Sequence, residues 1–271
     1  DPRDLHSFPT RRSSDLLKRS NRLINLLIKL HGEVRRINPD IVHVQYMAPG
    51  AIPIIATRLA GVKKVYATVH QPYTRSHGIL SRLILRSAAV MTSKFIAVSQ
   101  NAEKSWFDNS HLLNENITLS DQPSHFTIHN IVDSDRIGEI ISVCDTIRIR
   151  DGLNISQDKV IIGTLSRLRY EKGVDILIDG FTKLLPRYQN AHLLIVGDGP
   201  DGKKLCEMAD NSGIRDSITF TGAVDWEEAI KFMGIMDIVA VPSRFEGFGL
   251  TAAEAMAAGK QIGRASCRER V

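Results

Sequence analysis

The stretch from Asp237 to Lys260 constrains the fold of this chain more than any other. It opens with the apolar run Asp237–Val241, which is short, rich in β-branched residues and closed by a proline, as is typical of a buried strand. Residues 251–258 are rich in Ala, Glu and Met and are followed by Gly259, so they predict a helix with a glycine stop. A glycine-containing loop joins the two. Ligands of open α/β sheets bind at the carboxyl ends of strands, so this loop is a candidate ligand site.

Two glutamates accompany this loop. Glu246 lies at the end of the predicted strand and Glu254 lies on the first turns of the predicted helix, with seven residues between them. Free N–H groups of the loop and the helix N-terminus suit a phosphate or a sugar hydroxyl. The alternative is an ordinary strand–loop–helix whose two glutamates are solvated, since charged residues are mostly exposed.

The complete string from Pro242 to Gly259 reads P-S-x-x-E-G-F-G-L-x-x-x-E-A-M-A-x-G. It resembles the signature of the retaining nucleotide-sugar glycosyltransferases of family four. That family has the GT-B architecture, in which two Rossmann-like α/β domains face each other across a cleft. The resemblance implies that Glu254 holds the ribose of the nucleotide, whereas Glu246 and the loop backbone grip the donor sugar and its leaving side. The loop residues concerned are Gly247, Phe248, Gly249 and Leu250.

Strands and helices alternate along the rest of the chain, which predicts parallel, doubly wound sheets. Residues 108–121 are polar and rich in Asn, so they predict a loop, and a linker is expected from about residue 131 toward Asp158. The expected strands are 41–45, 65–70, 94–99, 126–130, 159–165, 192–196 and 217–220, and the expected helices are 23–37, 51–60, 80–92, 174–185 and 225–233.

The segment 166–173 carries a second candidate site. Arg167 and Lys172 flank a loop that leads from a predicted strand to the N-terminus of a predicted helix, and two cations with a helix dipole suit a diphosphate. The loop resembles the G-R-L-x-x-E-K-G element of the same family, with Ser166 where Gly is usual. The alternative is a pair of solvated cations. A Gly-x-Gly follows the strand 192–196, but the third glycine of a dinucleotide fingerprint is absent.

His70 ends the predicted strand 65–70. Taken alone, a histidine there is more often an ordinary surface or hydrogen-bonded residue than a functional one. The family resemblance implies instead that His70 reaches the cleft near the transferred sugar. His43 alternates within a strand and is interpreted as structural.

The two ends of the chain match no expected element. Residues 1–16 and 262–271 look like translations of a sequencing adaptor in opposite orientations, and natural basic tails are the alternative. We therefore expect a first partial domain with its linker at 17–150 and a second partial domain, which binds the nucleotide-sugar, at 151–261. The fold class predicted is α/β and GT-B-like, with both Rossmann-like domains incomplete.

Charge and cysteine content indicate the kind of ligand and the cellular compartment. The net charge is +5, of which the segment 262–271 supplies +2 from three arginines against one glutamate; the rest is mildly basic. That balance suits an anionic ligand or an anionic membrane face and specifies neither. Outside that segment, Cys144 and Cys206 form no disulfide or zinc pattern, which indicates a reducing cytosol. No apolar run is long enough for a transmembrane helix.

The resemblance implies transfer of a sugar, with retention, from a nucleotide-sugar donor to a carbohydrate or lipid-linked acceptor. Glu246 and His70 are the expected catalytic residues, and Arg167 and Lys172 would neutralise the departing diphosphate. No cofactor, no obligatory metal and no nucleic-acid partner are expected. We expect a cytoplasmic protein, with peripheral contact at the inner membrane face as an alternative. A nucleotide-sugar epimerase of the same architecture and a non-catalytic nucleotide-binding fragment remain the other interpretations.

Overall fold

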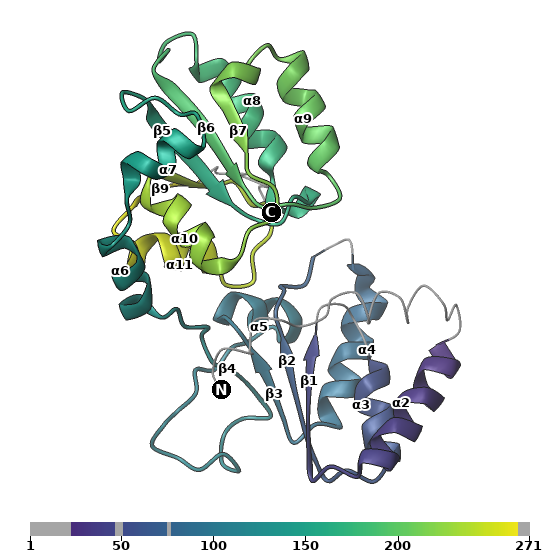
Figure 1. Ribbon diagram of the computed structural model, residues 1–271. Helices are drawn as coiled ribbons and strands as arrows, with labels where there is room; N and C mark the ends of the chain where they lie inside the picture. The colour runs from purple at the N-terminus through teal and green to yellow at the C-terminus, as the bar shows by residue number, and fades with distance from the viewer. Residues whose placement is uncertain (1–22, 47–50, 75–76, 265–271) are drawn as a thin grey trace. The chain divides into compact units, whose positions relative to one another are not determined.

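The computed structural model describes residues 23–46, 51–74 and 77–264, which form two compact units divided between His129 and Asn130 (Figure 1). Each unit carries one parallel β-sheet with helices packed on it, which confirms the predicted fold class. The segment 1–16, interpreted above as adaptor-derived, lies outside the described residues, and so do residues 265–271.

The first unit alternates helices and strands along a sheet of order β1-β2-β3-β4, in which every neighbouring pair is parallel. Its elements are α2 (Leu23–Ile37), β1 (Ile41–Tyr46), α3 (Ala51–Leu59), β2 (Lys64–Val69), α4 (Gly78–Val90), β3 (Lys94–Ala97), α5 (Gln100–Phe107) and β4 (His125–Thr127). The sequence pattern predicted all of these except α5. That helix is only eight residues long, and its ends are well defined: the Ser99 hydroxyl accepts from the Ala102 N–H, and Asp108 ends it with φ 73°.

The core of the first unit lies around β2. Val65 and Ala67 are fully buried, and Phe95 of β3 and Ile54 of α3 are buried with them. On β1, buried and exposed side chains alternate: His43 and Gln45 lie on one face of the strand and both are exposed. This places two polar side chains beside the carboxyl end of β2.

The second unit holds a sheet of order β7-β6-β5-β8-β9, again entirely parallel. Its chain order moves outward from β5 to β7, then returns to the other side of β5 with β8, so the β5–β8 boundary is a topological switch point. The elements are α6 (Ser134–Ser142), α7 (Thr146–Gly152), β5 (Val160–Leu165), the 3₁₀ turn η3 (Tyr170–Lys172), α8 (Val174–Leu184), β6 (Ala191–Val196), α9 (Gly202–Asn211), the 3₁₀ turn η4 (Arg215–Ser217), β7 (Ile218–Phe220), α10 (Trp226–Gly234), β8 (Ile238–Val241), α11 (Leu250–Ala257) and β9 (Gln261–Arg264).

Helices cover both faces of this second sheet, α8 and α9 on one and α10 and α11 on the other (Figure 1). All six residues of β6 are buried, as a central parallel strand requires. Leu193 and Ile195 pack with α8 and α9, whereas Leu194 and Val196 pack with α10. The apolar face predicted for the helix after residue 173 is confirmed, since Val174, Ile178 and Phe181 are buried.

Two expectations about chain segments were wrong. The segment expected as a linker forms α6 and α7, each capped by an aspartate, and α6 buries Ile137 and Ile140 in the core of the second unit. The division between units therefore lies earlier than residue 150. Residues 262–264, set aside as part of a non-native segment, pair with β8 as strand β9. Strand pairing uses backbone groups, so an edge strand forms without the side-chain pattern that a sequence analysis looks for.

His192 gives the second unit a pH-dependent stability. Its side chain is buried in β6 and its Nε2 lies 2.8 Å from the Thr219 hydroxyl. Burial, with a smaller effect of Lys159, lowers its pKa from 6.5 to about 4. As pH falls below 6.5, His192 becomes protonated in the unfolded chain but stays neutral in the folded unit. The free energy of unfolding therefore decreases down to about pH 4, by about 1.4 kcal/mol per pH unit.

We expect His192→Gln, which keeps a hydrogen-bonding group and removes the titration, to reduce the loss of stability between pH 7 and pH 4.5 by about 2–3 kcal/mol. Urea unfolding of both proteins across this range measures the difference. If the free energy of unfolding depended on pH in the same way in both proteins, His192 would have an ordinary pKa in the folded state.

Candidate functional site

The loops that follow β5 and β8 meet at the switch point of the second sheet. The Arg244 N–H donates to the Glu171 carbonyl at 2.9 Å, which joins the two loops through their backbones. Gly173 permits the approach: its φ is +66°, and a Cβ at this position would lie 2.2 Å from the Pro242 carbonyl oxygen. A glycine here is therefore a requirement of the contact.

Lys172 and Glu246, one from each loop, form an ion pair at this junction. The Lys172 Nζ lies 2.8 Å from the Glu246 Oε1, and both side chains are nearly three-quarters buried. The Ser243 hydroxyl donates to the same oxygen at 2.6 Å. Both contacts hold Oε1, so the carboxylate is anchored on one side, and within the described residues no further partner holds its Oε2. This arrangement presents one carboxylate oxygen to a ligand.

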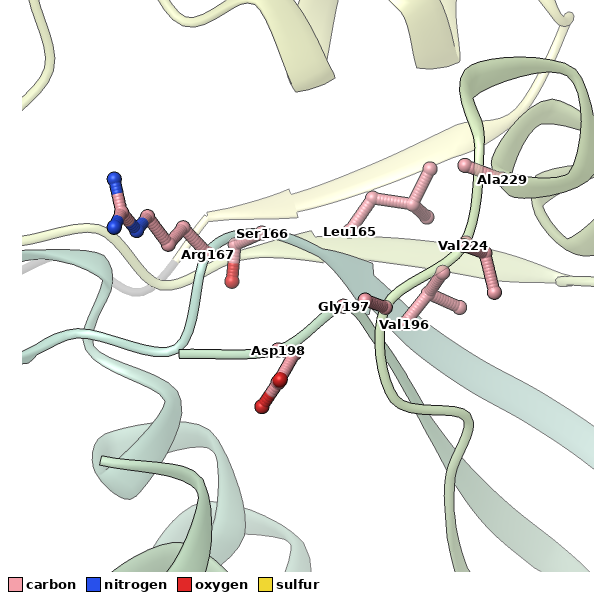
Figure 2. A pocket seen from close by; sticks show the side chains of 9 residues that line it. Leu165, Ser166, Arg167, Val196, Gly197, Asp198, Val224 and Ala229 are labelled. Carbon is pink, nitrogen blue, oxygen red and sulfur yellow. The ribbon is translucent and has the colours of Figure 1, made fainter. Parts of the chain in front are cut away.

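Arg167 lies at the other end of the first loop and borders an open hollow of about 340 Å³. Figure 2 shows its side chain and that of Asp198 at the polar end of this hollow, with apolar side chains gathered at the opposite end. Within the part of the chain that the structure describes, no hydrogen bond or ion pair holds the Arg167 guanidinium. The lining residues are Leu165, Ser166, Arg167, Val196, Gly197, Asp198, Ala223, Val224 and Ala229.

The backbone around the hollow is tightly fitted. A Cβ on Gly197, whose φ is +123°, would lie 2.2 Å from the Ser166 carbonyl oxygen. Ser166 lines the hollow, and its buried hydroxyl oxygen has no hydrogen-bond partner among the described residues. The turn for which the resemblance implies a glycine thus forms with a serine, which adds a polar atom to the lining.

The N-terminus of α11 completes this edge of the sheet. Gly249 precedes it with φ +91° and has no side chain to cap the first turn, so that turn keeps N–H groups available for an anion. The Thr251 hydroxyl donates to the Leu165 carbonyl at 3.0 Å, which fixes the start of α11 against the end of β5. Glu254 lies about one turn further on, and its Oε1 accepts from the Trp226 Nε1 at 3.0 Å. Of the other loop residues, Gly247 and Phe248 are half-buried and Leu250 is exposed.

His70 lies in the first unit, at the carboxyl end of β2. Its Nε2 lies 2.6 Å from the Gln45 Oε1, and since a carbonyl oxygen only accepts, Nε2 carries the proton. The Gln45 amide nitrogen lies 3.3 Å from the His43 ring, and the His43 Nε2 lies 2.7 Å from the Thr68 hydroxyl. Burial and the neighbouring His43 lower the pKa of His70, and burial lowers that of His43. His70 is thus held neutral, with its Nδ1 as the acceptor.

The second unit brings together Lys172 and Glu246 directly, and it fixes the start of the helix carrying Glu254 against the strand that leads to Arg167. His70 belongs to the first unit. The sequence analysis missed Ser243, although it stands within the P-S-x-x-E string, and it missed Trp226, which no motif marks. It assigned His43 a structural role and did not consider Gln45, because the link from Gln45 to His70 depends on strand register.

Two protein-family models match parts of this chain. Residues 145–262 match the family model described as glycosyl transferases group 1, and residues 2–119 match the model described as glycosyltransferase family 4. The group 1 match therefore lies within the second unit and the family 4 match within the first, and each covers 118 of the 271 residues. The second match begins inside the segment 1–16, so the adaptor interpretation of that segment stays a prediction.

Curated relatives align with most of this chain. It is 27% identical to N-acetyl-alpha-D-glucosaminyl L-malate synthase of Bacillus anthracis, over 86% of this chain and 58% of the relative. It is 24% identical to alpha-monoglucosyldiacylglycerol synthase of Acholeplasma laidlawii, over 89% of this chain and 62% of the relative. The chain thus spans about three-fifths of the length of these two relatives.

Among solved structures, Anabaena HepE in complex with UDP and glucose matches 88% of this chain and 62% of its own, with a TM-score of 0.66 and 22% identity. The crystal structure of TarM matches 88% of this chain and 44% of its own, with a TM-score of 0.65 and 17% identity. These similarities show that the fold is that of the GT-B glycosyltransferases.

The contact between the two loops of the second unit can be tested at Gly173. We expect Gly173→Ala to destabilise the second unit through the left-handed backbone and through collision with Pro242, the collision adding about 1–3 kcal/mol, the usual cost of overpacking. Gly213→Ala is a matched control, because Gly213 has φ +67° and nothing within 4 Å of its Cβ position. Urea unfolding of both variants gives the comparison. Equal losses at the two positions would mean that the loops do not need this close approach.

Proposed function

We propose that the protein transfers a sugar from a nucleotide-sugar donor to an acceptor hydroxyl, with retention at the anomeric carbon. The observation that carries this proposal is the Lys172–Glu246–Ser243 arrangement at the switch point of a parallel sheet. It combines a cation for a diphosphate with a carboxylate oxygen for a sugar hydroxyl. The spacing of Glu246 and Glu254 within the family string supports retention.

The residues divide the task as follows. The bond between the anomeric carbon and the diphosphate oxygen breaks as the acceptor oxygen bonds to that carbon. Negative charge develops on the diphosphate, which takes up the proton of the acceptor hydroxyl. Arg167, Lys172 and the first turn of α11 are the groups that stabilise this charge, since fixed cations and dipoles act most strongly where charge appears. Glu246 binds the donor sugar and Glu254 holds the ribose, while His70 from the first unit accepts a hydrogen bond from the transferred sugar. These assignments need no metal or other cofactor.

The acceptor is a carbohydrate or a lipid-linked acceptor in this proposal, within the synthesis of a polysaccharide or glycolipid. One relative supports a lipid acceptor, since its name gives a glucosylated diacylglycerol as product; the name of the other gives a glycoside of L-malate, which is a hydroxy acid. We place the protein in the cytoplasm, with contact at the inner face of the membrane if the acceptor is a lipid. None of the helices in the described ranges combines the length and apolar character of a membrane span.

Donor binding tests the proposal at Lys172. Lys172→Ala should weaken binding of a nucleotide diphosphate-sugar by about 1.5–3 kcal/mol, the usual scale of a charged hydrogen bond. Calorimetry with UDP-glucose, GDP-mannose and related donors gives the affinities. Lys203→Ala is the control, because Lys203 lies exposed on α9 in the same unit and should not change the affinity. Unchanged affinity in Lys172→Ala would remove Lys172 from the site.

Turnover tests the proposal at Glu246. Glu246→Ala should lower kcat by about a hundredfold or more with the fold intact, because the lost interaction is strongest where charge develops. Glu246→Gln keeps the shape and removes the charge, so it separates the two contributions, and Glu207→Gln on α9 serves as the control. The assay uses the natural full-length protein, with analysis of both the product and the released sugar. Normal turnover in a folded Glu246→Ala protein would end the proposed mechanism, and free sugar without acceptor product would favour the epimerase.

A further inference from the structure

Arg244 makes a dense set of contacts between the two loops of the site. Its Nη1 and Nη2 donate to the two carboxylate oxygens of Asp175, each at 2.7 Å, in a bidentate pair. Its Nη1 also donates to the Tyr170 carbonyl at 2.8 Å, and its guanidinium lies 4.1 Å from the centroid of the Tyr170 ring. Hydrogen bonds from Arg244 are the main cause that holds the pKa of Asp175 below its ordinary value.

These contacts end next to the two charged residues of the site. Tyr170 precedes Lys172 by two residues within η3, and Arg244 precedes Glu246 by two residues. Helix α8 begins directly after Gly173, the residue at which the loops touch, and Asp175 lies in its first turn. The guanidinium therefore ties the turn that carries Lys172 and the helix behind it to the loop that carries Glu246.

We propose that Arg244 is a positioning residue: it sets Lys172 and Glu246 at bonding distance and so preforms the site for a nucleoside diphosphate. This inference rests on the proposed function and names no contact between Arg244 and the ligand. The side-chain chemistry supports it. The planar fork of arginine matches a carboxylate and stacks on an aromatic ring at the same time, which the flexible, compact ammonium of lysine cannot do. The Arg244 side chain is 18% exposed and that of Asp175 is 37% exposed, so their pair is partly shielded from water.

A positioning role predicts that Arg244 acts through Lys172. Calorimetry with UDP as the probe, and GDP and ADP alongside, should show about tenfold weaker binding in Arg244→Ala than in the unaltered chain, within the range of coupling for neighbouring residues. Arg244→Lys should recover only part of this loss. In a Lys172→Ala background, Arg244→Ala should change the affinity by less than about twofold, because the residue that it positions is absent. Arg136→Ala on α6 is the control and should leave binding unchanged.

A second measurement needs no ligand. Lys172→Ala and Glu246→Gln should couple in their effects on the urea midpoint, and this coupling should disappear when Arg244 is alanine. Asp175→Asn, which removes the charge from the partner of Arg244 with little change in size, should weaken the coupling in the same direction. This variant carries the test if Arg244→Ala lowers the melting temperature.

The outcomes separate the two proposals. If no nucleoside diphosphate binds but the coupling is lost in Arg244→Ala, the proposed function fails and the positioning role stands. If UDP binds and the effects of Arg244→Ala and Lys172→Ala are additive, Arg244 acts independently of Lys172 and the inference is overturned. It is also overturned if the coupling persists without Arg244.

Discussion

The site depends on one close approach between two backbones. β5 and β8 are neighbours in the second sheet, and the chain leaves them through loops that would separate if any side chain stood at residue 173. Because a glycine with a left-handed backbone stands there, the Pro242 carbonyl reaches the start of α8. Lys172 directly precedes this point of contact and Glu246 follows it closely on the other loop. Their ion pair therefore follows from where two neighbouring parallel strands end. Ligands of α/β sheets bind at switch points for the same reason, because the loops from two such strands flank one crevice there.

The ion pair also shapes the electrostatics of the site without a ligand. Lys172 and Glu246 compensate each other, so a half-buried cation does not stand alone and the loops do not repel one another. An incoming diphosphate competes with Glu246 for Lys172, but an ammonium has three donors and can hold both partners. Arg167 is placed differently, since it is exposed at the edge of the hollow and no described residue pairs with it. Its guanidinium is free to bind an anion that enters the hollow, whereas Lys172 is held in place by its ion pair with Glu246.

The sequence predicted the helices, strands and loops better than it predicted which side chains bond to one another. The run 192–196 and the face of α8 were predictable, because burial on a parallel sheet leaves a dense apolar pattern. The loops around Lys172 and Glu246 were predicted from the family strings that contain them, because the same charges taken alone are equally explained as solvated side chains. Helices α6 and α7 and strand β9 were not, since their places are decided by caps and by backbone pairing. The Arg244–Asp175 link joins residues far apart in sequence, and no local pattern marks it.

The network around His70 shows the same limit and carries a chemical consequence. The register of β1 against β2 sets Gln45 beside Thr68, so Gln45 and His43 share a face with the end of β2. Gln45 fixes the proton of His70 on Nε2, and burial with the neighbouring His43 lowers its pKa, so the ring stays neutral near pH 7. A neutral imidazole contributes no charge to a departing diphosphate and offers an acceptor at Nδ1. In the proposed reaction, Arg167 and Lys172 are therefore the cationic groups, and the His70 Nδ1 is an acceptor suited to a sugar hydroxyl.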